Sequence, residues 1–68
     1  MSASKIIKQV LIEKGMTVKA LAELLGILPA SMRNKLYRDN FSFAETVQIL
    51  DLLGADVRVI MRESNKQF

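Results

Sequence analysis

The chain has 68 residues and, with ten basic and seven acidic side chains, a formal net charge of +3, so we expect one small domain. It has no cysteine and no histidine, which excludes disulfides, thiolate nucleophiles and the usual zinc ligands. Its apolar stretches are far shorter than the roughly 20 residues of a membrane-spanning helix, and Lys8 interrupts the first of them, so no secretory signal is expected. We therefore expect a cytoplasmic binding protein with no metal ion, cofactor, small-molecule ligand or membrane partner.

The first half of the chain predicts two helices. Apolar residues recur at helical spacing over residues 4–14, and Gly15 follows them, so we expect the first helix to end there. Thr17 is a suitable N-cap for a second helix over residues 17–25. Gly26 suits the left-handed residue that ends such a helix.

The second half predicts two more helices. Pro29 suits the first turn of a third helix over residues 29–38, because the first turn needs no amide donor at that position. Ser42 and Glu45 have the spacing of a capping box, which predicts a fourth helix over residues 43–53. The residues of this last helix that we expect in the core are Phe43, Val47, Leu50 and Leu53.

Residues 56–62 change from helical to alternating hydropathy, which predicts a β-strand. A lone strand leaves its backbone groups unpaired, and the last six residues are polar apart from Phe68, so they are expected to fray. We therefore predict antiparallel pairing with a second copy of the chain across a two-fold axis; the alternative is an edge strand lying on its own monomer. The predicted dimer interface contains Ile49, Leu52, Val57, Val59 and Met61.

The predicted second and third helices have the arrangement of a helix-turn-helix. They are short, a tight turn at Gly26 joins them, and the small Ala22 lies on the inner face, where a large side chain would push the helices apart. The third helix of such a unit can lie in the major groove of DNA, which is wide enough to admit an α-helix.

Three segments extend this pattern to most of the chain. They are residues 21–27 (Leu-Ala-Glu-Leu-Leu-Gly-Ile), residues 34–42 (Asn-Lys-Leu-Tyr-Arg-Asp-Asn-Phe-Ser) and residues 49–54 (Ile-Leu-Asp-Leu-Leu-Gly). With these segments the chain resembles the Cro/C1-type helix-turn-helix family, also called the XRE family of repressor-like regulators. The resemblance implies an all-α, four-helix, lambda-repressor-like domain over residues 1–68. It also implies that the third helix is the recognition helix.

Helical spacing assigns roles on that helix. Met32 and Leu36 are expected in the core, so the opposite stripe faces outward. The predicted base contacts are Ala30, Arg33, Asn34 and Tyr37, and the predicted phosphate contacts are Thr17, Lys19, Ser31, Lys35 and Arg38. The chain departs from the family at Leu28 and Pro29, where polar residues are usual. Base readout is therefore expected from Arg33 and Asn34, or from the shape of the DNA.

These observations predict a DNA-binding transcriptional regulator, a repressor acting as a homodimer on a palindromic operator. One alternative is a protein-interaction module that uses the same fold without DNA readout, with the basic residues forming only a solvated face. Another is the DNA-binding antitoxin of a toxin–antitoxin pair. An enzyme is not expected, because the acidic residues form no catalytic constellation and so short a chain leaves little room for a pocket.

Overall fold

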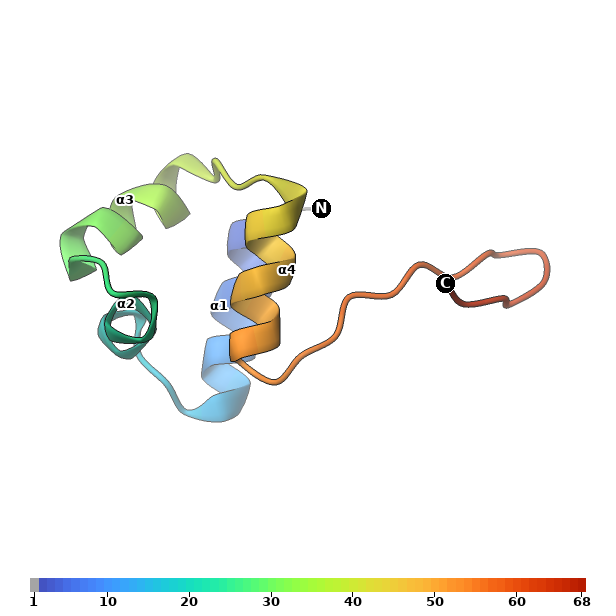
Figure 1. Ribbon diagram of the computed structural model, residues 1–68, viewed down its shortest axis with the longest axis horizontal. Coiled ribbons are helices and arrows are strands. Elements are labelled where there is room, and N and C mark those ends of the chain that lie inside the picture. Colours follow the sequence, from blue (N-terminus) through green and yellow to red (C-terminus); the bar gives the residue numbers. More distant parts are fainter. Residues whose placement is uncertain (1) are drawn as a thin grey trace.

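The computed structural model describes residues 2–68 and has four α-helices over this range. They are α1 (Ala3–Lys14), α2 (Val18–Leu25), α3 (Pro29–Arg38) and α4 (Phe43–Leu52). α1 and α4 lie side by side, α2 packs against α3, and the C-terminal segment extends away from the helices (Figure 1). The predicted all-α, four-helix fold is confirmed, and each predicted helix end lies within one residue of the observed one.

Local sequence explains where the helices begin and end. Gly15 and Gly26 end α1 and α2 with φ of 66° and 69°, in the left-handed region that residues with a Cβ rarely adopt. The hydroxyl of Thr17 accepts a hydrogen bond from an amide in the first turn of α2. Ser42 and Glu45 form the predicted capping box, with hydrogen bonds of 3.0 and 3.2 Å.

The apolar core lies where the four helices meet. Met32 and Leu36 of α3 are both buried, as predicted, and Ala22 is fully buried on α2, which packs against α3. The core residues are Ile7, Leu11, Leu21, Ala22, Met32, Leu36, Ile49, Leu50 and Leu53.

The rotation of α4 about its axis differs from the prediction. Leu50 and Leu53 are buried as expected, but Phe43 and Val47 are 73% and 36% exposed, and Ile49 is only 4% exposed. Ile49 was expected on the surface of the dimer, yet it packs in the core of its own chain. The apolar residues of α4 form two overlapping stripes of helical period, and periodicity alone could not decide which stripe faces the other helices.

The predicted strand over residues 56–62 is not supported: the part of the chain that the structure describes has no β-strand. Residues 59–68 instead form a C-terminal hairpin, in which Ile60 and Gln67 make an isolated antiparallel bridge. Backbone hydrogen bonds of 2.9 and 3.0 Å lie on either side of the bridge, and Asn65 in the turn has φ of 55°. The last residues, which we expected to fray, therefore pair with residues 59–61 of the same chain, whereas the prediction paired this segment with a second copy.

None of the helices within residues 2–68 combines the length and the apolar character needed to cross a lipid bilayer.

Candidate nucleic-acid interface

The outer face of α3 is an exposed stripe of polar and aromatic side chains. Tyr37 is 88% exposed, and the other predicted base-contact residues, Ala30, Arg33 and Asn34, are exposed as well. They lie on one side of α3 because their positions are separated by three, four and seven residues. The structure therefore brings the four predicted base-contact residues together. We call them the α3 stripe.

The charge on α3 is entirely positive. The helix has three of the ten basic residues of the chain and none of the seven acidic ones. The ion pairs recorded among residues 2–68 join Lys35 to Glu45 and Arg58 to Asp56, so neither uses Arg33 or Arg38. Both guanidinium groups on this helix can thus meet an anion without first breaking an ion pair.

Lys35 is placed differently from the other basic residues of α3. It is half-buried and turned toward α4, where its Nζ lies 2.9 Å from Oε2 of Glu45 and 5.6 Å from the centroid of the Phe41 ring. The hydrogen bond from Lys35, followed by one from the Ser42 amide, holds the pKa of Glu45 below its ordinary value. A phosphate contact by Lys35 would require this ion pair to open.

The remaining predicted phosphate contacts are exposed around the α3 stripe. Ser31 and Arg38 lie next to it on one side of α3, while Thr17 and Lys19 lie at the start of α2, which packs against α3. The hydroxyl of Thr17 accepts from the Ala20 amide at 3.1 Å, so its own hydrogen stays available to donate. The tight turn at Gly26 between these two packed helices is compatible with a helix-turn-helix.

The start of α3 is apolar. Leu28 occupies the N-cap position without a side-chain hydrogen bond, and Pro29 follows it in the first turn. Leu28 is 71% exposed, and Leu24 of α2 is also exposed. The residues at the start of α3 therefore present exposed apolar side chains near the α3 stripe.

The end of α3 is fixed to α1 by contacts that sequence reasoning missed. The hydroxyl of Ser4, which is buried, donates to the carbonyl oxygen of Leu36 at 2.7 Å, and the Ser4 amide donates to Oδ1 of Asp39 at 3.0 Å. Hydrogen bonds from the Ser2 hydroxyl and then from the Ser4 amide lower the pKa of Asp39. The sequence did contain one signal for this contact. Asp39 follows the predicted third helix, where a negative charge is unfavourable next to the C-terminal end of the helix dipole, so another interaction is expected to stabilise it.

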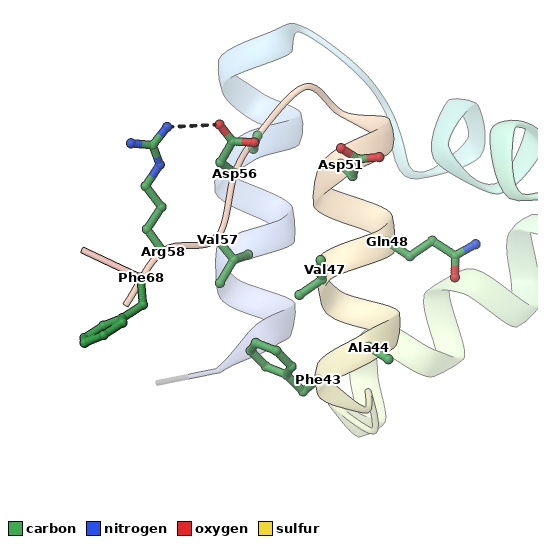
Figure 2. A pocket seen from close by; sticks show the side chains of 10 residues that line it. Phe43, Ala44, Val47, Gln48, Asp51, Asp56, Val57, Arg58 and Phe68 are labelled. Atoms are coloured by element: carbon green, nitrogen blue, oxygen red, sulfur yellow. Dashed lines mark ion pairs between the residues drawn. The ribbon is translucent and has the colours of Figure 1, made fainter. Parts of the chain in front are cut away.

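A second exposed surface lies on α4 and the C-terminal segment. Phe43, Val47, Val57 and Phe68 are among the residues that line a groove of about 760 Å³. Figure 2 shows Phe43 and Val47 on α4, with Val57 on the neighbouring segment pointing toward them. Four of the five predicted interface residues are exposed, namely Leu52, Val57, Val59 and Met61, whereas the fifth, Ile49, is buried.

No family model, no curated protein and no solved structure matches the chain. Within residues 2–68, no three histidine, cysteine, aspartate or glutamate side chains lie close enough together to hold a metal ion.

Proposed function

We propose that the protein is a sequence-specific regulator that binds double-stranded DNA by placing α3 in the major groove, acting in the cytoplasm as a repressor. The observation behind this proposal is the α3 stripe, which lies on a helix with no acidic side chain. The major groove of B-DNA, about 12 Å wide, admits an α-helix. Similarity of residues 21–27 and 34–42 to the Cro/C1-type family favours the same function.

The proposed base contacts follow from side-chain chemistry. Arg33 can donate two hydrogen bonds to guanine, and Asn34 can pair with adenine, each worth about 1–3 kcal/mol of discrimination against a wrong base. Ala30 suits the methyl group of thymine, and Tyr37 is exposed enough to stack or to donate from its hydroxyl. Arg33, Asn34 and Tyr37 lie in the middle and second half of α3, away from Leu28, whereas Ala30 lies in the first turn.

The proposed phosphate contacts are exposed residues of α3 and of the start of α2. Arg38 and Ser31 on α3, with Lys19 and Thr17 on α2, would position the helix on the duplex and supply the salt-dependent part of the affinity. Lys35 is left out of this set because its ammonium group is already paired with Glu45.

A homodimer is part of the proposal. Eight large apolar side chains are exposed in α4 and the C-terminal segment, and burying them between two copies removes this area from water. They are Phe43, Val47, Leu52, Val57, Val59, Ile60, Met61 and Phe68. We call this set the apolar face. Two copies joined there would present two α3 helices to successive turns of the major groove, about 34 Å apart, and read a roughly palindromic operator.

Substitutions on α3 test the proposal. On the preferred duplex, Arg33→Ala and Asn34→Ala are each expected to lower affinity by about fivefold or more and to relax base preference at one position of each half-site. Arg62→Ala removes the same charge as Arg33→Ala from the exposed C-terminal hairpin and serves as the matched control. Equal base preferences for the wild type and both α3 variants would contradict the base-contact assignment.

A protein partner is the second candidate function. The observation that favours it is the exposed pair Leu24 and Leu28 beside the start of α3. Under this alternative, Leu28→Ser would abolish partner binding, whereas binding to any duplex would be weak and would lack base preference.

A further inference from the structure

The molecule consists of two helix pairs that meet at the core. α1 packs with α4 and α2 packs with α3. The proposed DNA surface lies on the α2–α3 pair, whereas α4 and the segment after it form the proposed dimer surface. The geometry between the two pairs therefore determines where each recognition helix lies relative to the dimer axis.

Two polar contacts join the pairs. In the first, which we call the Ser4–Asp39 latch, α1 donates from the Ser4 hydroxyl to the Leu36 carbonyl at 2.7 Å and from the Ser4 amide to the Asp39 carboxylate at 3.0 Å. In the second, the Lys35–Glu45 latch, the ammonium group of α3 lies 2.9 Å from the carboxylate of α4. The Ser2 hydroxyl, at the start of α1, also donates to the Asp39 carboxylate and adds to the first of these contacts.

The latches contact α3 at separate places. The Ser4–Asp39 latch contacts the C-terminal end of α3, where Asp39 ends the helix with φ of 53°. The Lys35–Glu45 latch contacts α3 about one turn earlier and approaches from α4, so α3 is tied to both helices of the other pair. Ser4 is the buried polar residue of the described chain, which places its hydroxyl bond to Leu36 inside the packed interface, whereas Asp39 is exposed.

Hydrogen bonds restrict the relative orientation of the two helix pairs more than apolar packing does. Apolar burial has little directional preference, so the core alone allows the helix pairs to rotate slightly against each other. Hydrogen bonds weaken steeply when their angles deviate. Hydrogen bonds at two separate places on α3 therefore oppose both rotation of α3 about its axis and sliding along it. The paired latches therefore have the geometry of an orientation lock.

We propose that the two latches set the half-site spacing that the dimer recognises, which makes Ser4, Asp39, Lys35 and Glu45 specificity-determining positioning residues. This inference rests on the proposed function, since it requires a dimer whose two α3 helices read one operator. A fixed orientation between the helix pairs fixes the distance between the two α3 helices. A looser orientation accepts half-sites at several spacings.

The test uses duplexes in which the selected half-sites are moved apart or together in steps of one base pair. The variant is Ser4→Ala with Glu45→Gln, which removes the hydroxyl hydrogen bond of the first latch and the ion pair of the second. It touches none of the proposed DNA contacts and leaves an oxygen for the capping box. The preference of the wild type for its best spacing over the next is expected to fall by about fivefold in this variant, as for the loss of one net buried hydrogen bond. Glu45→Gln alone replaces the double variant if the latter does not fold.

Ile7→Val is the control, because it removes a buried methyl group from α1 and leaves both latches intact. It is expected to lower stability while retaining the spacing preference of the wild type. In the same proteins without DNA, residual dipolar couplings of backbone amides report the orientation of the α2–α3 pair relative to α1 and α4. We expect one orientation in the wild type and the control, and a shifted or averaged one in the latch variant.

The outcomes separate the two proposals. If the wild type selects a duplex and the latch variant keeps the same spacing preference, the inference is overturned while DNA binding stands. Unchanged dipolar couplings in the latch variant also overturn it, with or without DNA binding. If the folded wild type selects no duplex, the proposed function fails and the spacing claim fails with it.

Discussion

Lys35 and Glu45 join α3 to α4 through an ion pair with an Nζ–Oε2 distance of 2.9 Å. The same ammonium nitrogen also lies over the face of the Phe41 ring, 5.6 Å from the ring centroid. Lys35 therefore joins α3 to α4, although its position on a basic helix predicts a phosphate contact.

Salt dependence distinguishes Lys35 from Arg38. If Arg38 contacts one phosphate, Arg38→Ala should lower the slope of log affinity against log salt by about 0.9, because one fewer counterion is released. Lys35→Ala should change the slope less, since its charge is already paired with Glu45. Fluorescence anisotropy over a salt series measures both. Equal reductions in the two variants would show that Lys35 leaves the ion pair to bind phosphate.

Stability should depend on the buried hydroxyl of Ser4. Ser4→Ala removes the 2.7 Å hydrogen bond to the Leu36 carbonyl and should lower the free energy of unfolding by about 1 kcal/mol. Ser64→Ala on the exposed hairpin is the matched control and should change stability little. Urea unfolding followed by circular dichroism gives both values. A Ser4→Ala variant as stable as the control would mean that the buried bond contributes nothing net.

Stability should fall in acid through Asp39 and Glu45. The hydroxyl of Ser2 and the amide of Ser4 lower the pKa of Asp39 from its ordinary 3.8. The hydrogen bonds from Lys35 and then from the Ser42 amide lower the pKa of Glu45 from 4.5. Because the folded pKa values are depressed, this contribution is fully present well above 4.5 and is lost as the pH falls through 4.5 and 3.8 toward the folded pKa values.

Urea midpoints measured between pH 7 and pH 3 test this expectation. Asp39→Asn and Glu45→Gln cannot titrate at these positions, so each should flatten part of the acid-side decrease. An acid-side slope identical in the wild type and in both variants would assign the decrease to other carboxylates.

Self-association should depend on the apolar face. Val57 lines the groove beside Phe43 and Val47, and its side chain is exposed in the single chain, so Val57→Lys should prevent dimerisation without unfolding the helices. Sedimentation velocity over a concentration series measures the association state. Ser64→Lys, which adds the same charge at the hairpin turn, should leave it unchanged. A wild type that stays monomeric at the highest concentration would remove the dimer from the proposal.

Local sequence signals predicted the helices well. The ends of α1 and α2 adopt the left-handed conformation, which Gly15 and Gly26 allow. Ser42 and Glu45 form a cap whose two hydrogen bonds join residues only three positions apart. Such features are decided within one turn of chain, so the sequence alone locates them. The outward stripe on α3 was likewise predictable, because Met32 faces the core and the helical period places the rest.

Features that depend on distant residues could not be predicted in the same way. The burial of Ile49 in place of Phe43 depends on how α4 meets the other helices. The Ser4–Asp39 contact joins residues 35 positions apart, and nothing in the spacing of either residue indicates the other. The C-terminal hairpin was missed because its polar turn has no alternating hydropathy, although its backbone hydrogen bonds pair the last residues with the segment at Ile60.

The most direct test of the central claim is selection of binding sites from a randomised duplex pool by the wild-type protein at near-physiological salt. DNA recognition by α3 predicts enrichment of a two-fold symmetric motif whose half-sites lie about 10 base pairs apart, centre to centre. No enrichment from a sample that is folded by circular dichroism would contradict it and would direct attention to Leu24 and Leu28 as a surface for a protein partner.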